Sequence, residues 1–98
     1  MTTIVIDHVA LLGRDVHAMR VAFERLGFTP TPSKLLMRWD AKTGERESLK
    51  QESSHAVLEQ GYIELAAVLT DEPQHYMTPY LRRYQGLHVL AFRSTDID

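Results

Sequence analysis

Two segments at opposite ends of the sequence share one pattern. Residues 8–16 and residues 88–97 both open with His-Val, continue with apolar residues, and pass through a short polar turn to Asp and a branched aliphatic residue. Each pattern is typical of a β-strand that leads towards a helix. We interpret the second segment as the start of a repeat. Residues 1–86 then form one module with its connecting helix, and residues 87–98 begin a truncated second module.

The first module opens with a strand and a helix. Residues 4–12 are β-branched and apolar over a length that predicts a strand buried on both faces. Asp15 is placed to cap the helix that follows, and Gly27 supplies the left-handed conformation that ends it. One apolar stripe along this helix consists of Val16, Met19, Phe23 and Leu26.

The middle of the chain alternates between apolar and polar stretches. Residues 29–32 contain two prolines and predict an extended connector. Leu35, Met37 and Trp39 alternate with their neighbours as in a half-exposed strand. Residues 40–54 are mostly polar and charged, and we expect a loop there.

A hairpin, a short helix and a last strand complete the order β-α-β-β-β-α-β. Residues 55–69 predict the hairpin, with Gln60-Gly61 as its turn. That turn would place His55 and Glu64 diagonally on one sheet face. Thr78 is expected to cap the short helix, with Pro79 at its first position and Gly86 just past its end; residues 87–92 follow as a strand. The class is therefore α+β.

Composition excludes several kinds of protein. The 98 residues carry a formal net charge of -2, which gives no electrostatic reason to bind nucleic acid or an anionic membrane. The absence of cysteine excludes disulfides and thiolate chemistry. The sequence has no signal-peptide pattern and no window long enough to span a membrane, so we expect a cytoplasmic protein.

Three polar residues stand inside otherwise apolar strands, namely His8, Glu64 and His88. A carboxylate between Ile63 and Leu65 is costly to bury unless a proton, an arginine or a cation neutralises it. Two imidazoles and a carboxylate are suitable ligands for a divalent first-row metal. Taken singly, strand histidines are more often structural and a strand glutamate more often faces solvent, so both readings stay open at this point.

Four segments, in this order, resemble the vicinal oxygen chelate superfamily, which includes glyoxalase I, extradiol dioxygenases, and fosfomycin- and bleomycin-resistance proteins. They are Ile-Asp-His-Val-Ala-Leu at 6–11 with Asp15, Leu-Gly-Phe at 26–28, Gly-Tyr-Ile-Glu-Leu at 61–65, and Gly-Leu-His-Val-Leu-Ala-Phe at 86–92. The resemblance implies a βαβββ module of the glyoxalase-like fold, followed by a short helix and the first strand of a second module.

The resemblance also implies a site. By position, His8, Glu64 and His88 would be ligands of a divalent ion such as Zn, Ni, Mn, Co or Fe, and either Glu64 or a carboxylate at the fourth ligand position would also move a proton. The fourth ligand position belongs to the last strand of a second module that this sequence does not contain. The substrate would be lined by His55, Tyr62, Trp39 and Phe92. Open sheet edges would make the chain a homodimer.

Three functions remain open on these residues. The first is a glyoxalase-like enzyme of the lyase or isomerase type, in which a metal acts as Lewis acid on a small oxygen-rich substrate. An extradiol-dioxygenase-like protein is a variant of it, although dioxygenases take their carboxylate from the missing strand, so Glu64 favours the glyoxalase type. The second is a metal-independent binding protein of the bleomycin-resistance type. The third is a truncated domain without activity.

Overall fold

The computed structural model describes residues 3–94. Its elements are β1 (Ile4–Gly13), α1 (Val16–Arg25), β2 (Lys34–Asp40), β3 (Glu45–Leu58), β4 (Gly61–Val68), α2 (Thr78–Leu81) and β5 (Gly86–Ser94). The predicted order and the α+β class are confirmed. None of the helices in the described range is long and apolar enough to cross a bilayer.

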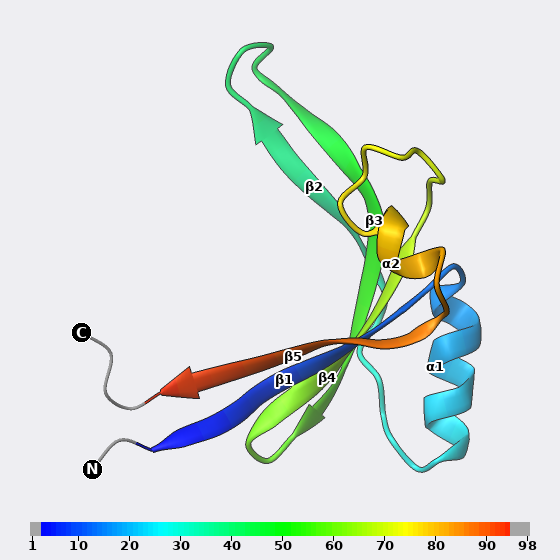
Figure 1. The fold of residues 1–98 in the computed structure, drawn as a ribbon, viewed down its shortest axis with the longest axis vertical. Coiled ribbons are helices and arrows are strands. Elements are labelled where there is room, and N and C mark those ends of the chain that lie inside the picture. The colour runs from blue at the N-terminus through cyan, green and yellow to red at the C-terminus, as the bar shows by residue number, and fades with distance from the viewer. Residues whose placement is uncertain (1–2, 95–98) are drawn as a thin grey trace.

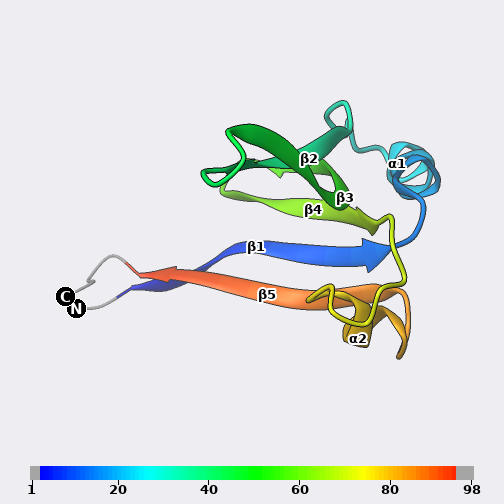
Figure 2. The same cartoon turned by 90° about the horizontal axis from the view of Figure 1, so that it is seen from above.

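All five strands form one mixed sheet in the order β2-β3-β4-β1-β5 (Figure 1). β1 is parallel to β4, whereas it runs antiparallel to β5, and the pairs β2–β3 and β3–β4 are antiparallel. Both helices lie near the carboxyl end of β1, as Figure 2 shows. Ile4 and Ser94 pair at the opposite end of the sheet.

The pairing of β1 with β5 is irregular at two places. Ile6 pairs with Phe92 and His8 with Ala91, so β1 has one extra residue, Asp7, between these pairs. Further along, the extra residue is in β5, where His88 lies between the partners of two consecutive β1 residues. The second irregularity restores the register that the first one changed. Extra residues of this kind are bulges, which redirect side chains relative to a regular strand.

The core is divided between the two faces of the sheet. On one face, which we call the α2 face, α2 packs over the sheet in a buried cluster of Leu12, Ala66, Val68, Met77 and Leu81. By alternation, the other face carries the buried residues Ser54, Ala56, Leu65 and Ala67, and α1 packs there. Three of these four side chains are small, which allows the helix to approach the strands closely.

The predicted caps of α1 are confirmed, and its stripe is partly wrong. Asp15 accepts a hydrogen bond from the Ala18 N–H at 3.1 Å, and Gly27 has φ of 98°. Val16 is buried, but Leu26 is 72% exposed. Leu26 is the C-cap, where the chain leaves the helix, so its side chain does not reach the sheet.

The expected loop at residues 40–54 is wrong. A four-residue turn follows Asp40, and β3 then runs as a fourteen-residue strand from Glu45. Its first half pairs only with β2, and the two strands form an arm that projects from the body (Figure 1). Both faces of a two-stranded arm meet solvent, so the first half of β3 is mostly polar and lacks the apolar alternation of a half-buried strand.

The hairpin turn lies one residue earlier than predicted. Leu58 pairs with Gly61, so the turn residues are Glu59 and Gln60. Two features disfavour a side chain at position 61. The φ angle of Gly61 is 110°, and an added Cβ would lie 2.3 Å from the Asp7 carbonyl oxygen. The observed β3–β4 register differs from the expected one by two positions. Side chains alternate with a period of two, so each residue of the hairpin still lies on the sheet face that was predicted for it.

Two further expectations fail locally. β1 is not buried on both faces along its length: Ile4 is 65% exposed, because β4 pairs with β1 only from His8 onwards. Thr78 does not cap α2: Met77 is the N-cap, and the buried Thr78 hydroxyl makes no capping bond. The helix begins one residue earlier than the sequence suggests, which places Pro79 at its second position.

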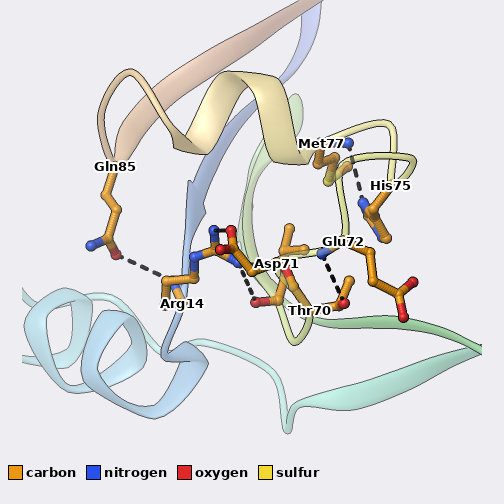
Figure 3. Close-up of polar contacts among 8 residues, drawn as sticks. Arg14, Thr70, Asp71, Glu72, His75, Met77 and Gln85 are labelled. Carbon is orange, nitrogen blue, oxygen red and sulfur yellow. Dashed lines mark hydrogen bonds and ion pairs between the residues drawn. The ribbon is translucent and has the colours of Figure 1, made fainter.

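An arginine fixes the segment between β4 and α2 to the end of β1. Arg14 Nη1 donates to the Thr70 carbonyl at 2.6 Å, and Nη2 lies 3.0 Å from Asp71 Oδ1. The Arg14 backbone N–H donates to Gln85 Oε1 at 3.2 Å (Figure 3). The same arginine side chain thus holds both the loop backbone and its first carboxylate.

Candidate functional site

Four of the predicted site residues meet on the α2 face. His8 on β1 pairs with Tyr62 on β4, and Glu64, two positions further along β4, pairs with His55 on β3. Regular alternation places all four side chains on one face. The expectation that His55 and Glu64 share a face is therefore correct, and they lie directly opposite each other, not diagonally.

The aromatic rings in this group are in contact. The His8 and Tyr62 rings are stacked, with centroids 4.6 Å apart and planes 5° from parallel. The His55 ring meets Tyr62 edge-on at 5.2 Å. His55 Nε2 lies 3.8 Å from Glu64 Oε2. Tyr62 thus lies between the two histidines, and Glu64 is within ion-pair distance of one of them.

Asp7 belongs to this site although it was not predicted. Its Oδ2 is 2.8 Å from His8 Nδ1, and its Oδ1 is 4.0 Å from Arg93 Nη1. Neighbouring residues of a regular strand point to opposite faces, so such a contact requires the bulge at Asp7. No periodicity in the sequence marks a bulge, and so nothing there indicated this carboxylate.

The ionisation of Tyr62 is affected by its surroundings. Burial raises the pKa of the Tyr62 phenol above its usual value, and the nearby carboxylates of Glu64 and Asp7 raise it further. A phenolate among these groups would be poorly solvated and repelled by two negative charges. Tyr62 therefore stays a neutral hydroxyl that can donate a hydrogen bond.

The other predicted site residues lie outside this contact group. His88 is stacked on Tyr84 at 4.1 Å, and its Nε2 lies 2.8 Å from the Tyr84 carbonyl oxygen. Trp39 lies on the arm opposite Arg46, and Phe92 is exposed on β5. Within residues 3–94, no ring contact joins either of them to His8 or Tyr62.

The residue that follows His88 lies in the same row of the sheet as Glu64. Val89 pairs with Ala10, which in turn pairs with Glu64, so the row from β5 to β4 passes through one small residue. Among the residues described, however, no group of three or more His, Cys, Asp or Glu side chains is arranged to hold a metal ion. One copy places two predicted ligands, His8 and Glu64, on one face of adjacent strands, whereas the third, His88, is bonded to the Tyr84 carbonyl.

A pocket of about 490 Å³ adjoins the group at His55. Its walls come from the connector before β2 and from strands β2 and β3, and they are formed by Thr31, Pro32, Lys34, Leu36, Ser53 and His55. The sequence did not indicate Lys34 or Ser53 as site residues. Ser53 was assigned to a loop, and only the pairing of β3 shows that it shares a face with His55.

Comparison with known proteins identifies the family of the chain. No curated protein matches the sequence. The family model described as glyoxalase-like domain matches residues 6–98, which is nearly the whole chain. This match confirms the resemblance to the vicinal oxygen chelate superfamily that the order of short motifs indicated, and the chain belongs to the glyoxalase-like domain family.

Proposed function

We propose that this chain is a glyoxalase-like, metal-dependent enzyme of the lyase or isomerase type that acts on a small oxygen-rich substrate. The observation that supports this best is the placement of His8 and Glu64. They come from adjacent parallel strands, share the α2 face, and have side chains that are about one-fifth exposed. An imidazole and a carboxylate in this position are donors that a divalent ion accepts.

The hydrogen bond from His8 to Asp7 supports metal binding. An Nδ1–H that donates to Asp7 fixes the tautomer and leaves the lone pair on Nε2 for a cation. Metal-ligating histidines usually donate their other ring nitrogen to a carboxylate or carbonyl in this way. A divalent ion held here would act as a Lewis acid that polarises substrate oxygens.

The protein's own groups would handle the proton. Glu64 is the proposed base, and His55 at 3.8 Å can take or return a proton and stabilise the carboxylate. Tyr62, held neutral by its raised pKa, can donate to a substrate oxygen on the same face. In the extradiol-dioxygenase variant of this proposal, the same residues would bind the oxygens of the substrate.

A complete metal site needs further ligands besides His8 and Glu64, and these would come from His88 and from another protein surface. With its Nε2–H donated to the Tyr84 carbonyl, His88 keeps Nδ1 as the nitrogen available to a cation. We propose His88, from the same or a neighbouring copy, as the third ligand. The antiparallel pairing of β1 with β5 supports the interpretation of residues 1–86 and 87–98 as successive modules, which stays a prediction.

The surface area supports a homodimer. A monomer of 11.2 kDa has an accessible surface of about 5,700 Å² on average, whereas this chain exposes 7079 Å². The radius of gyration is 15.3 Å, against about 13 Å for a compact chain of this length. The difference in area exceeds the roughly 800 Å² that each partner buries in a standard interface.

The edges of the sheet indicate where a second copy would bind. β2 carries Lys34, Arg38 and Asp40, charges of the kind that discourage pairing. β5 carries one charge, Arg93, whose Nη1 lies 4.0 Å from Asp7 Oδ1, and it contains no proline and no lysine. Its Leu87 and Phe92 are exposed. We therefore propose that the second copy covers β5.

A metal-independent binding protein is the second candidate. The contact of Tyr62 with both His8 and His55 favours it, because three rings in contact make a wall for a planar ligand without any ion. In that case the α2 face would bind its ligand equally well with or without a metal.

Metal uptake separates these candidates. Metal-free protein would be titrated with nickel, cobalt, zinc and manganese by calorimetry, using the His8→Ala and Glu64→Gln variants and His17→Ala as control. His17 is an exposed histidine of α1, so its loss tests for surface binding. We expect uptake by the wild type and by His17→Ala, and a loss of at least about tenfold in affinity in the other two. Uptake by none of them would rule out the enzyme proposal and favour the binding protein.

A further inference from the structure

We propose that the pocket beside His55 is a binding site for a small oxyanion, a carboxylate or phosphate, that carries a short apolar group. The pocket lies between the connector before β2 and the strands β2 and β3. It is separate from the proposed metal ligands His8 and Glu64, which do not line it. Two of its side chains, Ser53 and Lys34, indicate an anion, and each contributes a different interaction.

Ser53 provides a buried hydroxyl without a partner. The residue is 5% exposed, lines the pocket, and its Oγ makes no hydrogen bond within residues 3–94. A buried polar atom without a partner destabilises the fold, so such atoms are rare and require an explanation. An anionic oxygen in the pocket would accept this hydrogen bond.

Lys34 provides the positive charge. It pairs directly with Ser53 across the β2–β3 ladder, so the two side chains are neighbours on one face. Its ammonium group takes part in no ion pair of the described residues. Glu64, the nearest carboxylate of the proposed site, is on β4, on the opposite side of β3 from Lys34. The lysine is therefore available to an external anion.

The rest of the pocket limits the ligand. Pro32 and Leu36 form apolar walls, and the volume of about 490 Å³ fits a small molecule. His55 lines the pocket and also contacts Tyr62 and approaches Glu64. If the proposed function is correct, an anion anchored at Lys34 and Ser53 would direct the rest of the substrate past His55 towards Glu64.

Two probes test the site on the whole chain. Isobutyrate and inorganic phosphate would be titrated into isotope-labelled protein and followed by amide chemical shifts, with the neutral isobutyramide for comparison. We expect isobutyrate, phosphate or both to shift the amides of Lys34, Ser53 and His55, and isobutyramide to bind at least about tenfold more weakly. The stronger of the two anions identifies the substrate's head group. No shift at these amides with either anion would overturn the proposal.

Variants assign the interaction to these side chains. Lys34→Gln should weaken anion binding at least about tenfold, and Lys42→Gln, in the exposed turn between β2 and β3, should not. Equal weakening by both would show an effect of net charge alone and would overturn the site. Ser53→Ala should also weaken binding while leaving the melting temperature of the unliganded protein unchanged or higher, because it removes an unpartnered hydroxyl.

The metal titration keeps this inference distinct from the proposed function. Neither Lys34→Gln nor Ser53→Ala should change metal uptake, and Glu64→Gln should leave binding of isobutyrate in place. Anion binding without metal uptake would contradict the enzyme proposal alone. Metal uptake without anion binding would contradict the oxyanion site alone.

Discussion

The imidazole of His8 lies flat on the phenol ring of Tyr62, with centroids 4.6 Å apart and planes 5° from parallel. The two residues are partners across the parallel β1–β4 pair, so the backbone of each strand holds one of the two stacked rings in place. Asp7 holds the His8 ring at Nδ1. A histidine with its ring face and one nitrogen both occupied has one orientation, as a ligand or a wall of a binding site requires.

Tyr62 should ionise at a higher pH than an ordinary tyrosine. Its raised pKa means that the native state favours the neutral phenol, and this contribution to stability is complete below the unfolded-state pKa of about 10. It is lost as the pH rises through the native pKa. Glu64→Gln removes one of the two repelling carboxylates and should lower the pKa of Tyr62, measured by tyrosinate absorbance against Tyr62→Phe. Glu47→Gln on the arm serves as control, and an equal shift in both would refute the electrostatic cause.

Gly61 should be far less replaceable than Gly44. Both have positive φ, but an added Cβ at Gly44 meets nothing within 4 Å, whereas at Gly61 it would lie 2.3 Å from the Asp7 carbonyl oxygen. Gly44→Ala should cost about 1 kcal/mol of unfolding free energy, from backbone strain alone. Gly61→Ala should cost about 3 kcal/mol, because strain and overpacking add. Denaturant unfolding measures both, and similar losses would mean that the β3–β4 turn does not pack on β1 as described.

Arg14 should stabilise the segment before α2 chiefly through backbone carbonyls. Arg14→Met removes the bond to the Thr70 carbonyl and should cost about 1–2 kcal/mol, discounted for partial exposure. Asp71 is 76% exposed, so Asp71→Asn should cost at most about 0.5 kcal/mol. Hydrogen exchange of the 69–72 amides should accelerate in Arg14→Met only. If Asp71→Asn has the larger effect, the ion pair dominates instead.

A charge on β5 should prevent self-association. Leu87 is 53% exposed on the edge strand, and Leu87→Lys places there the side chain that natural edge strands use against pairing. Sedimentation equilibrium should show dimers for the wild type and monomers for this variant. Leu26→Lys, at a leucine outside the sheet that is even more exposed, should remain dimeric. A monomeric wild type, or dissociation of both variants, would contradict the proposed interface.

Local rules predicted the elements whose causes lie within a few residues. Asp15 and Gly27 bound α1 as expected, because capping bonds and positive φ are properties of the immediate chain. The prediction that His55 and Glu64 share one sheet face was correct, although the turn residues were predicted wrongly. An error of two positions in register preserves the faces, whereas an error of one would have reversed them.

Features that depend on distant partners were not predictable. Residues 45–54 of β3 were missed because the first half of the strand belongs to a solvated arm and the next residues bury polar side chains, Gln51 and Ser53 among them. The exposure of Ile4 follows from where β4 begins to pair, which no pattern within β1 reveals. Asp7 joined the site through a bulge, and Ser53 through the part of β3 that was expected to be a loop. The errors thus occurred where tertiary pairing, not local preference, decides the outcome.

The two extra residues between β1 and β5 confine the change of register to the part of the sheet that carries His8. Because one insertion in each strand compensates for the other, only the three pairs between Asp7 and His88 are displaced, and the ladder on either side keeps its phase. A change of length at either position would alter how the neighbouring histidine is presented while leaving the distant strands undisturbed.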